Sequence, residues 1–181
     1  MPELGKTNGE TDALYFYVPM SRYILMSLAT FGVYQFYWIY KNWEYLKNRD
    51  KMDIHPFWRG WFGIFFCNSL LNTIHDDALL KQYKPAEFQA TVLAAVWIIA
   101  VIGTNLLTRL GIPFILDPLV LLLALMFLLA IQIWSFVPVQ QYINDANGRL
   151  KPAARYYPWS AGHFILLGLS LALMMFSLGS T

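Results

Sequence analysis

Charged residues are scarce in this chain, and their scarcity is the first constraint on what the protein can be. They make up 13% of the 181 residues, whereas hydrophobic residues make up 57% and aromatic residues 17%. Soluble domains usually carry about 25% charged residues, so this chain has too little polar surface to cover a water-soluble particle of its size. The composition therefore predicts an integral membrane protein.

Residues that bind metals are also few. Cys67 is the single cysteine, which excludes an intramolecular disulfide and a cysteine-rich metal site. Three histidines are present, His55, His75 and His163. No two of them lie three or four positions apart, as two ligands on one helix face would. We therefore expect no metal and no cofactor.

The sequence offers little for catalysis or for nucleic-acid binding. A net charge of +2 is too small to indicate a strongly anionic partner such as nucleic acid. The chain contains no glycine-rich phosphate loop and no G-x-S-x-G motif, and its clearest apolar segments carry no Glu, Lys or Arg away from their ends. Acid–base or nucleophilic catalysis needs such groups near one reacting atom. An enzyme is the least favoured class, and we expect no catalytic residue.

What the chain does have is long apolar runs. A polar N-terminal tail over 1–19 is expected to precede a single membrane domain over 20–181. A stretch of about 20 apolar residues is long enough to cross a bilayer as a helix. The pattern predicts an all-α bundle with four to five transmembrane segments. The apolar segments are 20–40, 57–75, 87–108, 114–137 and 160–178.

The third and fourth segments are the clearest. The short sequence RLGIP joins them, and its Gly111 and Pro113 suit a tight turn between helices. We therefore expect an antiparallel helical hairpin. Asp117, next to Pro118, is interpreted as a helix-entry residue.

The second segment is interpreted as re-entrant or interfacial. It is short, and it carries Arg59 near its start and Asn68 and Asn72 inside. If all five segments cross, basic residues divide evenly between the two sides. If 57–75 does not cross, most of them lie on one side, which agrees with the rule that basic loops stay in the cytoplasm. The charges therefore favour four spans, with the larger basic loops cytoplasmic and both termini outside.

A weak internal repeat complicates this topology. Four residues recur at a constant offset of 102. Either chance or a duplication explains four matches. A duplication would be an inverted repeat if the chain crosses the membrane five times, and a parallel repeat if it crosses four times. The sequence alone leaves the question open. The pairs are Tyr40 and Tyr142, Asn42 and Asn144, Pro56 and Pro158, and Gly60 and Gly162.

One region resembles a known family. The residues Thr30-Phe-Gly32-Val-Tyr34, Tyr37-Trp38-Ile-Tyr40-Lys41-Asn42-Trp43 and Pro56-Phe-Trp58-Arg59 are similar to the signature of a family of small bacterial multi-pass membrane proteins of unknown function. The similarity covers roughly 20–70. It implies a protein of the bacterial inner membrane, and it implies no activity, cofactor or catalytic residue.

Polar residues within the apolar segments are candidates for function, because burying them in lipid is costly unless they face protein or water. They could bridge neighbouring helices by hydrogen bonds or line a polar path. Gln132 is the residue most worth testing as an interhelical bridge, and Thr104 and Asn105 are expected partners of the asparagines. The candidates are Asn68, Asn72, Thr104, Asn105 and Gln132.

Two further groups of residues are assigned from pattern. Aromatic and basic residues at the end of the first segment are typical of the membrane interface and of lipid headgroup contact; these are Tyr37, Trp38, Tyr40, Lys41, Asn42 and Trp43, with Arg59 beyond them. Small residues four apart allow helices to approach closely; these are Ala86, Ala90, Ala94, Gly168 and Ala172.

The sequence thus predicts a non-catalytic accessory or interaction subunit. Its partners would be the lipid bilayer and another membrane protein or a second copy of itself. The alternative is a small transporter, channel or lipid-handling protein that uses a polar path between helices. The small-residue stripes and the lack of buried ionisable groups favour the first.

Overall fold

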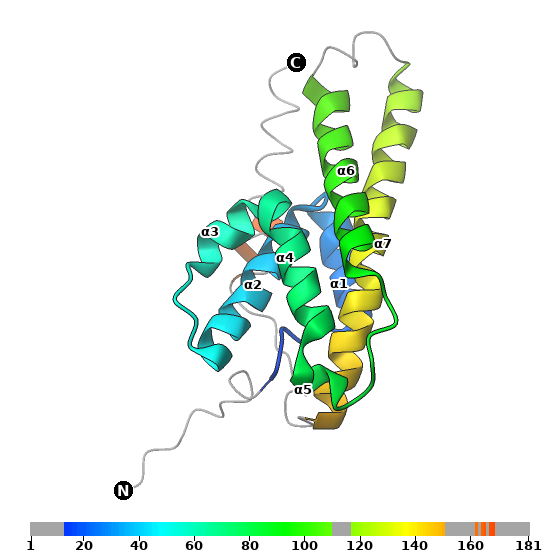
Figure 1. Ribbon diagram of the computed structural model, residues 1–181. Helices are drawn as coiled ribbons and strands as arrows, with labels where there is room; N and C mark the ends of the chain where they lie inside the picture. The colour runs from blue at the N-terminus through cyan, green and yellow to red at the C-terminus, as the bar shows by residue number, and fades with distance from the viewer. Residues whose placement is uncertain (1–12, 110–116, 151–161, 163, 166, 169–181) are drawn as a thin grey trace, which may run out of the picture.

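Every regular element in the described part of the chain is an α-helix, which confirms the all-α prediction. The computed structural model describes residues 13–109 and 117–150, together with 162, 164, 165, 167 and 168. Figure 1 shows a long hairpin with shorter helices packed beside its lower half. The helices are α1 (Met20–Ala29), α2 (Val33–Asp50), α3 (Pro56–Trp61), α4 (Gly63–Asp76), α5 (Ala78–Lys81), α6 (Ala90–Arg109) and α7 (Pro118–Leu150).

The hairpin consists of α6 and α7, which lie side by side as the sequence predicts (Figure 1). Among the described helices, only these two are long and apolar enough to cross a membrane. The Asp117 side chain accepts a hydrogen bond from the Leu119 amide at 2.9 Å and so caps α7, confirming its role in helix entry. The connecting residues 110–116, with Gly111 and Pro113, lie outside the described residues.

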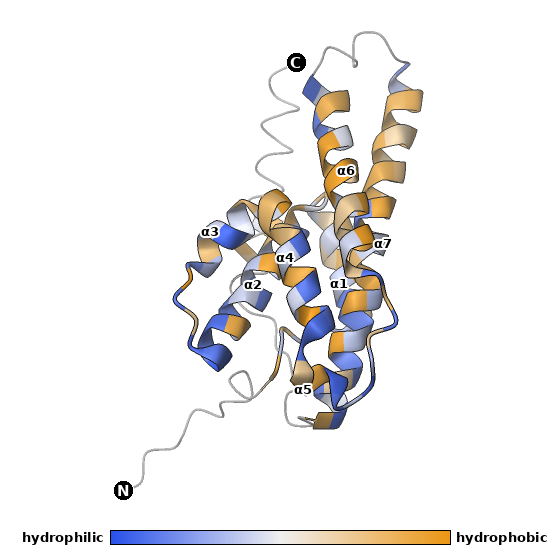
Figure 2. Ribbon diagram, viewed as in Figure 1, coloured by the Kyte–Doolittle hydropathy of each residue, from blue (hydrophilic) through white to orange (hydrophobic). Residues whose placement is uncertain are grey.

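Helix α7 continues well past the predicted end of the fourth segment at residue 137. It has 33 residues, or about 50 Å at 1.5 Å per residue, whereas the hydrocarbon core of a bilayer is about 30 Å thick. Its last third carries the polar sequence from Gln140 to Arg149. Figure 2 shows this change from apolar to polar along α7.

The prediction of one spanning helix over 20–40 is wrong. The chain turns at Thr30–Gly32, and α1 has only 10 residues. Phe31 and Gly32 have φ of 48° and 89°, a left-handed conformation that glycine adopts without strain and that ends a helix. The Thr30 hydroxyl donates to Met26 O at 2.7 Å and accepts from the Tyr34 amide at 2.9 Å, which ties the two helices together.

The second apolar segment is also divided. Helix α3 ends at Trp61 and α4 begins at Gly63, with Phe62 between them. Neither piece is long enough to cross a bilayer, since a crossing needs about 20 residues. The break agrees with a re-entrant or interfacial segment. The total number of crossings stays a prediction, because most of the fifth segment lies outside the described residues.

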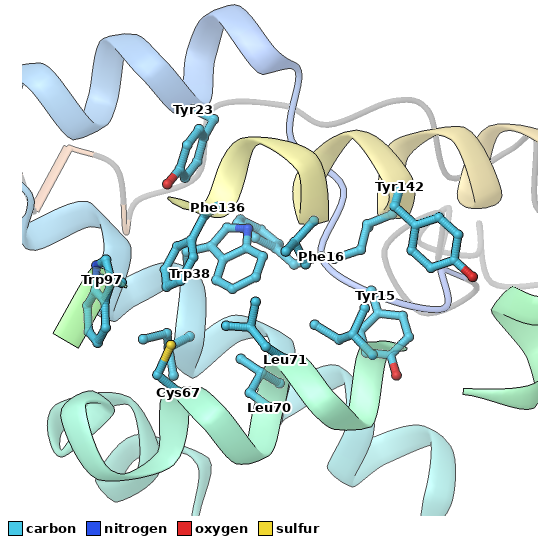
Figure 3. Close-up of a cluster of buried hydrophobic side chains, with 14 of the residues drawn as sticks. Tyr15, Phe16, Tyr23, Trp38, Cys67, Leu70, Leu71, Trp97, Phe136 and Tyr142 are labelled. Atoms are coloured by element: carbon cyan, nitrogen blue, oxygen red, sulfur yellow. The ribbon is translucent and has the colours of Figure 1, made fainter. Parts of the chain in front are cut away.

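Aromatic side chains form the centre of the core. Phe136 of α7 stacks on Trp38 of α2 at 4.8 Å between ring centroids, and on Trp97 of α6 at 5.3 Å. Figure 3 shows these three rings with Cys67, Leu70 and Leu71 of α4 nearby. All are buried. The core therefore joins α2, α4, α6 and α7 and fixes the position of the short helices against the hairpin.

Candidate functional site

The N-terminal segment, residues 13–19, is bound inside the fold. The prediction of a polar tail over 1–19 is wrong for these residues, because Tyr15, Phe16 and Val18 are fully buried. The charged and polar residues before position 13 give the region its polar average, whereas ALYFYVP itself is apolar. The segment has no helical or strand structure of its own, so its buried main-chain groups need hydrogen-bond partners elsewhere.

Side-chain amides of α2 and α7 supply these partners, and we call Asn42, Gln140, Asn144 and Asn147 the amide cluster. Asn147 accepts from the Leu14 amide and donates to Tyr15 O, both at 3.0 Å. Asn42 accepts from the Phe16 amide at 3.2 Å. An amide side chain presents a donor and an acceptor, so it can bind a peptide group much as a neighbouring strand would.

Gln140 joins the most groups in the cluster. Its Nε2 donates to Phe16 O at 3.3 Å and to Asn144 Oδ1 at 2.6 Å, and its Oε1 accepts from the Trp38 indole N–H. Asn144 in turn donates to Val18 O at 2.8 Å. Figure 3 shows Trp38 and Phe16 of this region beside α7. The cluster carries no charge, so it is suited to binding and positioning a main chain rather than to moving protons.

An ionic contact holds the same segment at its N-terminal end. The Tyr15 hydroxyl donates to Asp77 Oδ2 at 2.6 Å, and Arg49 Nη2 lies 2.7 Å from the same oxygen. Burial and the hydrogen bond to Asp77 raise the pKa of the Tyr15 phenol, so it stays protonated and donates. The Asp77 Oδ1 also accepts from the Leu79 amide at 2.8 Å and caps α5. Asp77 thus joins the segment to α2 and α5.

Replacing Asp77 by asparagine is expected to lower the free energy of unfolding by about 1.5 kcal/mol, because a buried charge pair with Arg49 is lost. The neighbouring Asp76→Asn is the matched control, since its side chain is 67% exposed against 5% for Asp77. Thermal unfolding of both variants in detergent checks the difference. Equal melting temperatures would contradict the assigned role of Asp77.

The predicted intramembrane polar residues fall into three separate groups. Gln132 of α7 donates to Thr104 of α6 at 2.9 Å, which confirms it as an interhelical bridge. Asn68 and Asn72 bond to each other at 2.9 Å, and Asn72 reaches Thr91 on α6 at 3.3 Å. The expected pairing of these asparagines with Thr104 or Asn105 is wrong, because Asn72 meets α6 near its first residues, whereas Thr104 and Asn105 lie near its end.

Asn105 forms the third group, since it donates to Val101 O of its own helix at 2.9 Å. Among the described residues, no hydrogen bond of one group reaches another. In the described part of the chain the five candidates do not line one path.

The interpretation of the aromatic sequence 36–43 as an interfacial belt is wrong for its central residues. Trp38, Asn42 and Trp43 are at most 1% exposed and belong to the core and the amide cluster. Tyr37, Tyr40 and Lys41 are half-buried, and Lys41 pairs with Glu44. A run of aromatic residues has the same composition at an interface and in a core, because composition does not record which helix face has a neighbour.

The small residues are placed as follows. Ala90 and Ala94 are buried and Ala86 packs at the edge of the core, so this stripe serves internal packing, with α4 the closest neighbour of α6 after α7. Among the residues that the structure describes, none has an atom within 4 Å of the position of an added Cβ on Gly168. Ala172 and His163 lie outside the described residues. Within 13–109 and 117–150, no three His, Cys, Asp or Glu side chains gather as metal ligands would.

The repeat at offset 102 takes an unexpected form. Asn42 and Asn144 do not occupy matching sites in two halves, since both bind the same N-terminal segment. An added Cβ on Gly60 would meet Tyr40, so in a true repeat one on Gly162 would meet Tyr142, the counterpart of Tyr40. It would instead meet Tyr37, at 2.9 Å. The sequence signal thus identified two members of the amide cluster without identifying their role. Gln140 and Asn147 carried no sequence signal beyond being polar.

No protein-family model, curated protein or solved structure matches this chain. The resemblance to small bacterial multi-pass membrane proteins therefore stays a prediction.

Proposed function

We propose that the protein is a non-catalytic integral membrane subunit that binds another membrane protein or a second copy of itself. The observation that carries the proposal is an apolar stripe along one face of α7. Leu119, Leu123, Phe127 and Trp134 are all exposed, at spacings that put them on one face. The stripe leaves a wide apolar surface unpaired within the described fold, and Figure 2 shows that the upper part of α7 is apolar throughout.

The buried polar groups support the same proposal. The amide cluster is occupied in binding the protein's own N-terminal segment, and Gln132 and Asn72 each bond to a neighbouring helix. Interhelical hydrogen bonds of this kind stabilise membrane bundles by about 0.6 to 2 kcal/mol each. They favour a packed scaffold over a hydrated pathway.

A photoreactive amino acid at Trp134, the most exposed residue of the stripe at 73%, tests the proposal in intact membranes. We expect a discrete protein adduct, and a differently tagged second copy distinguishes self-association from binding of another protein. Ile99 of α6, 68% exposed, is the control position away from the stripe. Only lipid adducts at Trp134, and again at Phe127, would contradict the proposal.

The orientation in the membrane gives a separate prediction. The C-terminal ends of α2 and α7 lie near α5 at one end of the molecule, and the C-terminal end of α6 lies at the other (Figure 1). Single cysteines at the exposed positions Asn48, Lys81 and Arg149 should therefore react with an impermeant maleimide from one side of the membrane. A cysteine at Arg109 should react from the other side. Labelling of positions 48 and 149 from opposite sides would exclude this placement.

A further inference from the structure

Arg59 occupies a rigid aromatic site on the surface of the short helices. Its guanidinium carbon lies 4.3 Å from the centroid of the Trp43 ring and 5.3 Å from that of Phe66. The backbone of α3 lies directly on Tyr40, since an added Cβ at Gly60 would come within 2.9 Å of Tyr40 Cα. Helix α3 is therefore held against α2, and Arg59 is fixed over Trp43.

The charge of Arg59 is not neutralised within the described residues. The ion pairs there join Lys41 to Glu44, Arg49 to Asp50 and Asp77, Asp76 to His75 and Lys81, and Lys84 to Glu87, and none includes Arg59. The indole N–H of Trp43, the ring beneath Arg59, also has no hydrogen-bond partner there although it is buried. A guanidinium stacked on an aromatic ring keeps its N–H edge free for an anion, and a phosphate oxygen is a suitable acceptor.

Exposed aromatic residues lie on the same short helices, α3 and α4, and in the link between them. Rings stack between Phe57 and Trp61 at 6.3 Å and between Trp58 and Phe62 at 6.0 Å, and Phe65 is 77% exposed. Tryptophan is enriched where hydrocarbon meets headgroups, because its ring is apolar and its N–H is polar. Sequence patterns placed the aromatic interface on 36–43, and the structure instead exposes the rings of 57–65.

The depth of Arg59 matches that interface. Gly32 lies against Gln132, with Gln132 Oε1 2.8 Å from an added Cβ, and Gln132 is about 21 Å along α7 from Pro118 at 1.5 Å per residue. If the hydrocarbon core is about 30 Å thick and begins at Pro118, the α1–α2 turn lies inside it, about 9 Å short of the far boundary. Trp38 of α2 stacks on Phe136 and donates to Gln140, which lie about 27 and 33 Å along α7 from Pro118. Trp43 is more than one turn beyond Trp38 on α2, which puts Trp43 and Arg59 at headgroup level.

We propose that Arg59, on the same short helix as the exposed Trp58 and Trp61, binds the phosphate of an anionic phospholipid, with the acyl chains along Phe62 and Phe65. The proposal rests on the membrane location in the proposed function and adds a lipid partner to it. The Arg59 guanidinium donates to the phosphate while Trp43 and Phe66 hold its plane. No proton transfer or covalent step is involved.

The test is native mass spectrometry of the full chain in mild detergent, titrated with phosphatidylglycerol or with phosphatidylcholine. We expect tighter binding of phosphatidylglycerol, and about tenfold weaker binding in Arg59→Gln, because a charge-assisted hydrogen bond is lost. Lys81→Gln removes an equal charge from an exposed position on α5 and should change affinity less than about twofold. Equal losses in the two variants would overturn the proposal.

Competition with a free anion and a second variant complete the experiment. Inorganic phosphate should not displace the lipid, and displacement by phosphate alone would show a free-anion site and overturn the lipid assignment. If Arg59→Gln unfolds, Trp61→Leu keeps the cation and removes one exposed ring of α3, and it should weaken lipid binding about threefold. Unchanged binding in Trp61→Leu would then count against the proposal. The cysteine labelling described above can agree with the membrane placement while phosphatidylglycerol binds no more tightly than phosphatidylcholine. That combination would leave the membrane location intact and reject only the lipid site.

Discussion

Replacing Gly60 by alanine is expected to lower the free energy of unfolding by about 3 kcal/mol, the upper end of the usual cost of overpacking. The added Cβ would overlap Tyr40 Cβ and lie 2.9 Å from Tyr40 Cα. Tyr40 Cα is backbone of α2 and cannot rotate away as a side chain could. Helix α3 would have to move off α2, which would also remove Arg59 from Trp43.

The matched control is Gly103→Ala within α6. Among the described residues, an added Cβ there would meet only the Leu128 side chain, at an ordinary 3.5 Å, and alanine is favoured over glycine in a helix by about 0.5 to 1 kcal/mol. Thermal unfolding in detergent should therefore show a lower melting temperature for Gly60→Ala and an equal or higher one for Gly103→Ala. A Gly60→Ala variant as stable as the parent would show that α3 does not lie on α2 as described.

Replacing Gln140 by leucine is expected to cost about 4 kcal/mol, because it takes a hydrogen-bond partner from at least two groups in the interior at about 1 to 3 kcal/mol each. These are the buried Trp38 indole N–H and the partly buried Asn144 Oδ1. Val18 O keeps its bond from Asn144. Leucine is at least as large as glutamine, so the loss reports hydrogen bonding rather than lost volume.

Gln141→Leu is the control, since Gln141 is the exposed neighbour on the same helix. It should change stability by less than about 0.5 kcal/mol. Adding Trp38→Phe to Gln140→Leu removes the orphaned indole donor, so the double variant should lose less than the sum of the single losses. Proteolysis after residue 19 should also accelerate in Gln140→Leu, because the N-terminal segment is released. Strict additivity would mean that Trp38 and Gln140 do not interact.

The Tyr15, Asn147 and Gln140 contacts explain why the site was only partly predictable from sequence. Asn42 and Asn144 stood out through a repeat, but the segment they bind looked like a tail. Gln140 bonds to Phe16 across a separation of 124 residues. A hydrogen bond between residues so far apart in the sequence produces no periodic pattern within a short window, because the residues near either partner do not depend on it.

The sequence by itself determined the helical class, the α6–α7 hairpin, the cap at Asp117 and the bridge from Gln132. Each of these depends on residues close in the chain or on the length of an apolar run, and both are local properties. Only the tertiary structure decided that Trp38 and Trp43 are interior, that the segment 13–19 is bound by side-chain amides, and that the rings of 57–65 are exposed. The physical reason is that burial depends on what packs against a residue, and those neighbours come from distant parts of the chain.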